Sequence, residues 1–222
     1  MPTLLSRRSL VMSTAGAAVA ARLPLPAIAE EAPVKIGLLT IKTGPLAPVG
    51  IQMEQGTVLF LKDRDHKMAG REVELVVSDT GGNPAGAKTK AQELIERDNV
   101  DLIFGPLAAF ELLAISSYVA SKKVPILSLA AAEDMTQRKP NPYFVRASAT
   151  SAQAMHPLAD YAAKYLNYKT VITVSDDFAF GYEQMGGVSA GLRGFGRTGG
   201  QKAVAADRHP RLHALSRAGR RR

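Results

Sequence analysis

The stretch from Val100 to Thr136 constrains the fold most, because two short apolar runs flank one helical segment. The first run, Asp101–Phe104, ends at Gly105-Pro106, and the second run is Ile126–Leu129. Between them, the apolar residues of Phe110–Ser121 recur at the spacing of one buried helix face. A strand, a helix and a strand within about thirty residues have the size of one βαβ unit. The pattern therefore predicts two parallel strands joined by a crossover helix.

The loops that follow these two strands are expected to lie side by side, because parallel strands end at the same edge of a sheet. These loops are Gly105–Phe110 and Leu129–Asp134. Open parallel sheets bind ligands in the crevice outside their strand ends. A helix that begins near Phe110 directs free backbone N–H groups into that crevice, which favours a carboxylate. The stretch therefore predicts a binding site for a small anion.

The same alternation continues along the chain. Further strands are predicted at Val34–Ile41, Glu72–Ser78, Tyr143–Val145 and Thr170–Val174. Further helices are predicted over Val49–Asp65 and Ala152–Leu166. Another helix is predicted to begin after Asn83, which would cap it, with Pro84 in its first turn. Regular β/α alternation is typical of a doubly wound α/β fold built on a parallel sheet.

Catalytic and cofactor motifs are weak. The chain has no cysteine, which excludes disulfides, thiol nucleophiles and cysteine-based zinc sites. No Ser, His and Asp constellation suggests hydrolysis, so we expect no enzyme activity, no metal and no cofactor. Gly194–Gly199 fits the dinucleotide pattern G-x-G-x-x-G, but it does not follow a predicted strand. An oxidoreductase on a doubly wound sheet is the enzyme alternative.

The basic character of the chain is confined to its end. Residues Ser189–Arg222 carry eight arginines and one lysine against one acid, which accounts for the whole net charge of +8. The preceding body is charge-balanced, so we expect no nucleic-acid partner for it. This end has six glycines and no apolar periodicity, and it lacks the next expected strand. We predict an aberrant, disordered tail over 189–222, with an out-of-frame gene end as the hypothesis and a basic arm for an acidic partner as the alternative.

The N-terminal residues 1–29 have the features of an export signal. Arg7-Arg8 precedes an apolar run, Leu10–Ala21, and Ala27–Ala29 forms a small-x-small cleavage site. The segment resembles a twin-arginine signal, although Leu10 stands where that signal usually has phenylalanine, and Sec export remains open. We expect a periplasmic protein whose signal is cleaved near Ala29.

Several motifs, in this order, span about residues 34–188. They are KIGLLTIKTGPLAPVG, VELVVSDTGGNP, LIFGPLAAFE, VPILSLAAAE, PYFVRASAT and VSDDFAFGYE. In this series the chain resembles the periplasmic substrate-binding proteins of branched-chain (hydrophobic) amino acid ABC transporters. The resemblance implies a type I periplasmic binding fold, in which two lobes close on a ligand. Residues 30–148 would form lobe one, Ala147–Thr150 the hinge crossing, and 149–188 the start of an incomplete lobe two.

The resemblance also implies where the ligand lies. It assigns eight positions to the site: Val49, Ala108, Ala109, Phe110, Ala130, Ala131, Ala132 and Phe180. The family usually has hydroxyl side chains where this chain has Ala109 and Ala132, and leucine-binding relatives tend to have an aromatic residue at Val49. These departures, together with Phe110 and Phe180, keep an aromatic carboxylate open as an alternative to a hydrophobic amino acid.

The implied partners follow from the same resemblance. They are a small carboxylate ligand and an ABC permease in the inner membrane, and the chain is expected to be a monomer. Binding would proceed by hinge closure, in which contacts from both lobes stabilise the closed form. An incomplete second lobe would weaken or abolish ligand binding. An extracellular sensor domain of the same fold is a further alternative.

Overall fold

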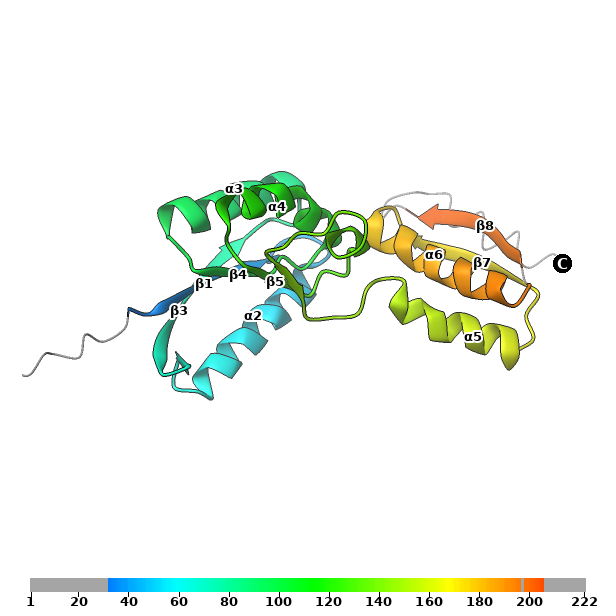
Figure 1. The fold of residues 1–222 in the computed structure, drawn as a ribbon, viewed down its shortest axis with the longest axis horizontal. Coiled ribbons are helices and arrows are strands. Elements are labelled where there is room, and N and C mark those ends of the chain that lie inside the picture. The colour runs from blue at the N-terminus through cyan, green and yellow to red at the C-terminus, as the bar shows by residue number, and fades with distance from the viewer. Residues whose placement is uncertain (1–31, 197, 206–222) are drawn as a thin grey trace, which may run out of the picture. The chain divides into compact units, whose positions relative to one another are not determined.

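The computed structural model describes residues 32–196 and 198–205, and its first part is a six-stranded sheet (Figure 1). The strands are β1 (Val34–Thr40), β2 (Lys67–Met68), β3 (Arg71–Asp79), β4 (Leu102–Phe104), β5 (Ile126–Ser128) and β6 (Phe144–Arg146). Their order is β2-β3-β1-β4-β5-β6, and every neighbouring pair is parallel except β2 with β3. The predicted parallel α/β sheet is confirmed.

Helices lie on both faces of this sheet (Figure 1). Helix α2 (Ala47–Lys62) covers one face, and α3 (Pro84–Gln92) and α4 (Ala109–Lys122) cover the other. A short π-helical turn, η1 (Glu93–Arg97), continues α3. The Asn83 side chain accepts a hydrogen bond from the Gly86 N–H at 2.8 Å, so the predicted cap of α3 is present.

The main hydrophobic core lies between the sheet and the pair α3 and α4. Its fully buried members include Leu39, Leu94, Ile103, Leu112, Ile115, Val119 and Ile126. The α2 face has a much smaller buried cluster of Ile36, Leu61 and Val73. Beside it, an apolar groove of about 550 Å³ is lined by residues that include Phe60, Phe104, Leu127 and Leu129. The two sheet faces are therefore covered unequally.

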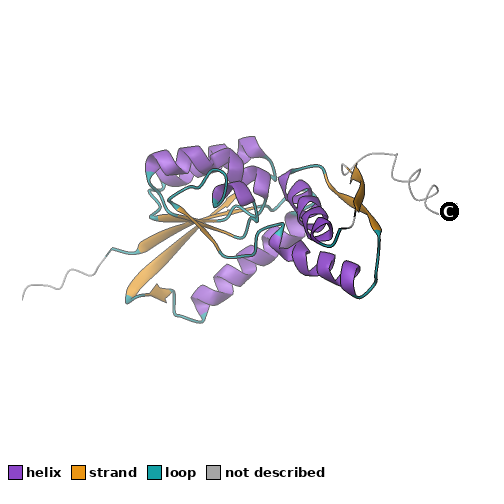
Figure 2. Cartoon of the chain, turned by 45° about the vertical axis from the view of Figure 1, so that its right-hand side comes forward, coloured by secondary structure: helices purple, strands orange, loops and turns teal. Residues whose placement is uncertain are grey.

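The second part of the chain has its own small sheet. Its elements are η3 (Gln153–Met155), α5 (His156–Lys164), β7 (Thr170–Asp176), α6 (Ala179–Gly194) and β8 (Thr198–Ala205). Strands β7 and β8 pair in parallel, and α5 packs on α6 through Ala159, Ala163 and Leu192 (Figure 2). In the connecting segment, the Ala147 N–H donates to the Ser128 oxygen at 3.0 Å and the Ser151 N–H to the Ala131 oxygen at 3.1 Å.

The prediction that regular structure stops at residue 188 is wrong for the described residues. Helix α6 continues to Gly194, and β8 is the strand that the sequence reading expected to be missing. Two glycines of α6, Gly187 and Gly191 (the latter within the predicted tail), allow close helix packing. A Cβ atom on Gly191 would lie 2.5 Å from the Cβ of Ala159, and one on Gly187 would lie 2.7 Å from the Ala152 oxygen. Residues 206–222 lie outside the described residues.

Candidate ligand-binding site

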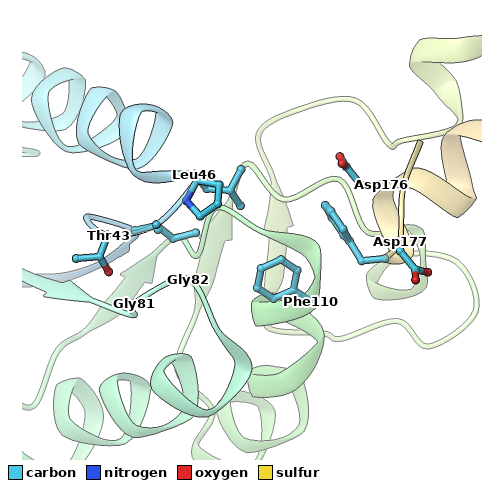
Figure 3. Close-up of a pocket in the computed structure, with 11 residues that line it drawn as sticks. Thr43, Leu46, Gly81, Gly82, Phe110, Asp176 and Asp177 are labelled. Carbon is cyan, nitrogen blue, oxygen red and sulfur yellow. The ribbon is translucent and has the colours of Figure 1, made fainter. Parts of the chain in front are cut away.

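A pocket of about 310 Å³ lies beyond the C-terminal ends of β1, β3 and β7 (Figure 3). The β1–α2 loop contributes Ile41 and Thr43–Leu46, and the β3–α3 turn contributes Gly81 and Gly82. Phe110 comes from the first turn of α4, and Asp176–Phe178 lie at the end of β7 and directly after it. The pocket thus receives residues from both sides of the connecting segment 147–151, at the strand ends where parallel sheets bind ligands.

The predicted juxtaposition of the two alanine-rich loops is confirmed. Strands β4 and β5 are parallel neighbours, with Ile103 opposite Ile126. The Ser128 hydroxyl donates to the Pro106 oxygen at 2.6 Å and accepts from the Ala130 N–H at 2.9 Å. One side chain therefore holds the loop after β4 against the loop after β5.

The alanines of these loops face the protein interior. Ala109, Ala130 and Ala132 are at most 3% exposed and belong to the main core, and Ala108 is 6% exposed. Ala131 is half-buried, and its oxygen accepts the Ser151 N–H. None of the five lines the pocket. Three of them share the main core with Met135, so a direct ligand contact for the five alanines remains a prediction.

Of the three remaining predicted residues, one lines the pocket and two do not. Phe110 lines the pocket, whereas Val49 is about half exposed and the wall there is formed by Gly44–Leu46. Phe180 is partly buried and packs against the main core, so Phe178, two residues earlier, takes the place at the pocket. The role of Val49 and Phe180 in binding is also still a prediction.

Two phenylalanines form the aromatic wall of the pocket. The rings of Phe110 and Phe178 meet edge to face with centroids 5.4 Å apart, and Phe178 stacks on Phe180 at 6.1 Å. Sequence reasoning missed Phe178. Applying the strand-end rule to β7, as it was applied to β4 and β5, would have directed attention to Asp176–Phe178.

The charge at the pocket is negative. Asp176 and Asp177 are exposed and lie across the pocket from Thr43 and Gly81 (Figure 3). The Tyr182 hydroxyl donates to the Asp177 carboxylate, and this hydrogen bond raises the pKa of the tyrosine. Among the described lining residues there is no lysine, arginine or histidine. Two carboxylates beside an apolar wall favour a ligand that carries an ammonium group.

The start of α4 offers hydrogen-bond donors next to Phe110. Its cap residue Ala108 is extended, with φ −91° and ψ 143°, and no side chain caps the helix. The first backbone N–H groups of a helix have no partner within the helix. An uncapped helix start beside a pocket is suited to a carboxylate.

A second polar contact joins the two parts of the chain away from the pocket. The Glu183 carboxylate on α6 accepts the Glu133 N–H at 3.0 Å, and Arg138 lies 3.6 Å from the same carboxylate. Glu133 begins the short helix η2 (Glu133–Met135), and its own carboxylate accepts the Thr150 hydroxyl at 3.1 Å. The loop after β5 thus contacts both the connecting segment and α6.

The segments 32–196 and 198–205 contain neither a metal site nor a membrane-spanning helix. No cluster of three or more His, Cys, Asp or Glu residues within them is arranged to hold a metal ion. Within the same segments, no helix combines the length and the apolar character needed to cross a membrane.

Comparison with known proteins decides the family. The sequence profile described as "Periplasmic binding protein" matches residues 33–213. The chain belongs to this periplasmic binding protein family. The predicted family is confirmed. The match runs through α6 and β8, while the out-of-frame origin of the end of the chain stays a hypothesis. Binding proteins rather than enzymes make up the family, so the expectation of binding without catalysis is supported at the level of the family.

Individual relatives are binding proteins of the same kind. A Leu/Ile/Val-binding protein homolog 6 of Brucella abortus (strain 2308) is 29% identical over 151 residues, which cover 68% of this chain and 38% of the relative. The chain thus spans well under half the length of that curated relative. An ABC transporter substrate-binding protein from Sphaerobacter thermophilus is 30% identical, with a TM-score of 0.75 over 85% of this chain and 52% of its own.

A third relative has a different ligand. The solute-binding protein of an ABC transporter from Rhodopseudomonas palustris BisB5, solved with 3,4-dihydroxybenzoic acid, is 29% identical. Its TM-score is 0.76 over 84% of this chain and 52% of its own. These similarities confirm the type I periplasmic binding fold, of which this chain covers about half.

Proposed function

We propose that this chain belongs to the periplasmic solute-binding component of an ABC transporter for branched-chain or other hydrophobic amino acids. Its partner would be a permease in the inner membrane, and residues 1–29 would direct export. The observation that carries the ligand assignment is the pairing of an aromatic wall, Phe110 and Phe178, with two carboxylates, Asp176 and Asp177, in one pocket. An amino acid with an apolar side chain matches both features.

The three groups of such a ligand find complementary partners in the pocket. The ammonium group pairs with Asp176 or Asp177, and the side chain packs on the two phenylalanines and Leu46. The carboxylate accepts hydrogen bonds from the uncapped start of α4 and from the Thr43 hydroxyl. A volume of about 310 Å³ lies at the lower end of the range for small-molecule pockets, which suits a single amino acid.

An aromatic carboxylate is the second candidate, because the Rhodopseudomonas relative was solved with 3,4-dihydroxybenzoic acid. The phenylalanine pair would accept such a ring. Its only charge, however, would enter a pocket with two carboxylates and no lining lysine, arginine or histidine among the described residues. Like charges in a partly dry site repel, so the amino acid is favoured.

Hinge closure would couple binding to transport. The pocket draws residues from both sides of Ala147–Thr150, so a ligand that touches both sides stabilises the closed form over the open one. Among the described residues after Thr150, Asp176–Phe178 alone line the pocket, so the contacts from that side are few. We therefore expect affinity for leucine weaker than micromolar.

Three ligands that differ by one group each test the proposal. Leucine carries both charges, isoamylamine lacks the carboxylate, and 4-methylpentanoate lacks the ammonium group. Titration of the ¹⁵N-labelled chain, followed by amide shifts at Gly81, Gly82 and Asp177, measures weak dissociation constants directly. We expect leucine to bind best and 4-methylpentanoate worst. Equal or tighter binding of 4-methylpentanoate would remove the proposed ammonium site, and shifts confined to residues outside the pocket would remove the proposed location.

A further inference from the structure

Glu111 is a buried carboxyl group directly behind the pocket wall. It is the third residue of α4, next to Phe110, and it is 0% exposed. The Thr80 hydroxyl donates to its Oε1 at 2.5 Å, while its Oε2 has no partner. Neither Glu111 nor Thr80 lines the pocket. A buried carboxyl with an unpaired oxygen lowers stability, so its presence at this position calls for a cause other than packing.

Thr80 transmits the position of Glu111 to the pocket turn. Its hydroxyl accepts the Gly82 N–H at 3.3 Å, and its own N–H donates to the Thr40 oxygen at 2.9 Å. Gly81 and Gly82 line the pocket with φ of +67° and +66°. A Cβ on Gly82 would lie 3.3 Å from the Cγ2 of Ile41, so this turn packs closely on the β1–α2 loop. These contacts connect α4 to the β3–α3 turn and to the β1–α2 loop, which form two other walls of the pocket.

Glu111 also belongs to the start of the helix that carries Phe110. It occupies the third helical position and directly follows Phe110 in the first turn of α4. One carboxyl therefore links the helix start at Phe110 to the turn at Gly81 and Gly82.

The ionisation of Glu111 is balanced between opposing effects. Burial raises the pKa of its carboxyl, while the hydrogen bonds from Thr80 and from the Ala108 N–H lower it. Asp79, at the end of β3, adds a like charge that raises it further. If the carboxyl is protonated, its proton is donated to the Thr80 oxygen, and the Thr80 proton turns to the Thr40 oxygen, 3.2 Å away. The Thr80 oxygen then accepts both the Glu111 proton and the Gly82 N–H, since a hydroxyl oxygen has two lone pairs.

We propose that Glu111 is a positioning residue for the ligand pocket, which fixes Phe110 and the Gly81–Gly82 turn relative to each other without touching the ligand. The proposal rests on the proposed function, because it assumes that this pocket binds the amino acid. Ligand affinity should therefore depend on the Glu111 carboxyl group. If Glu111 served packing alone, an apolar side chain of the same size could replace it without loss of affinity.

Two substitutions at Glu111 and one control separate positioning from packing. Glu111→Met fills the same space without hydrogen bonds, and Glu111→Gln keeps an oxygen acceptor. Glu96→Met removes an exposed carboxyl outside the pocket. We expect Glu111→Met to keep or raise the thermal midpoint while it weakens leucine binding about tenfold, because Phe110 and the Gly81–Gly82 turn are no longer held in the geometry that binds the ligand. Glu111→Gln should retain most of the affinity, and the control should change neither quantity.

A second pair of variants addresses the case in which Glu111→Met does not fold. Thr80→Val removes the hydroxyl and should weaken leucine binding to the same extent, whereas Thr80→Ser should preserve it. Unchanged affinity in both Glu111→Met and Thr80→Val would overturn the proposal. If stability and affinity fall together and to the same extent, Glu111 is a structural residue and the proposal also fails.

Failure of the proposed function gives a different result. In that case leucine produces no amide shifts in the unaltered chain, and the positioning role is judged on ligand-free spectra alone. Displaced amide signals of Phe110, Gly81 and Gly82 in Glu111→Met, with unchanged signals in Glu96→Met, would support positioning. Signals that stay in place would overturn it.

Discussion

The rings of Phe110 and Phe178 meet edge to face, with centroids 5.4 Å apart and planes inclined by 84°. Phe110 precedes the segment Ala147–Thr150 in the chain and Phe178 follows it, so this contact joins the two parts of the fold at the pocket. Edge-to-face pairs contribute about 0.5–1.5 kcal/mol beyond the area that they bury. The same two rings can therefore hold an apolar ligand and favour closure around it.

Replacement of Phe178 should weaken ligand binding through loss of this wall. We expect Phe178→Ala to raise the dissociation constant for leucine about five- to tenfold, because the aromatic contact and part of the apolar surface are lost. The measurement is the amide-shift titration of the labelled chain. Phe195→Ala is the matched control, since Phe195 lies outside the pocket at the end of α6. A loss of the same size in the control would mean that the effect is not local.

The glycines of α6 should differ in their tolerance of a methyl group. A Cβ on Gly191 would lie 2.5 Å from the Cβ of Ala159, whereas one on Gly194 meets nothing within 4 Å. We expect Gly191→Ala to lower the free energy of unfolding by about 1–3 kcal/mol through overpacking. Gly194→Ala should raise it by up to about 1 kcal/mol through helix propensity. Urea unfolding measures both, and equal effects would show that α6 does not pack on α5 at Gly191.

The buried carboxyl of Glu111 should leave a signature in the pH dependence of stability. Its pKa is raised above the ordinary value of 4.5, so the folded state holds its proton more tightly than the unfolded state. This contribution is fully present below pH 4.5 and is lost as the pH rises through the folded-state pKa. We expect the thermal midpoint of Glu111→Gln, relative to that of the unaltered chain, to rise as the pH increases across this window. A constant difference between the two would contradict a raised pKa.

Much of the fold could be predicted from local patterns. The apolar runs at Asp101–Phe104 and Ile126–Leu129, with a helix period between them, gave the parallel β4–β5 pair and the adjacency of its loops. Asn83 before Pro84 located the start of α3. These signals depend on neighbours in the chain, so they can be read from sequence. The short strand β2 (Lys67–Met68) is only two residues long and has no such pattern.

The pocket was harder to predict because its surface depends on packing. Alanine at positions 109 and 132 has the same small side chain whether it faces a ligand or the core, and the structure places both in the core. Phe178 and Phe180 are equivalent in sequence, and only the direction of the first turn of α6 decides which of them lines the pocket. Gly191 was counted in the predicted tail because Ala159, its packing partner on α5, is distant in the sequence.

The central claim is that the pocket recognises an amino acid through Asp176 and Asp177, and the most direct test is a ligand comparison in one variant. Leucine and 3,4-dihydroxybenzoate are titrated into the labelled chain and into the double variant Asp176→Asn with Asp177→Asn, with Asp160→Asn on the surface of α5 as the control. We predict that the unaltered chain and the control prefer leucine, and that the double variant loses leucine binding while it gains affinity for the aromatic acid. Preference for the aromatic acid in the unaltered chain, or leucine binding unchanged by the double substitution, would contradict the claim.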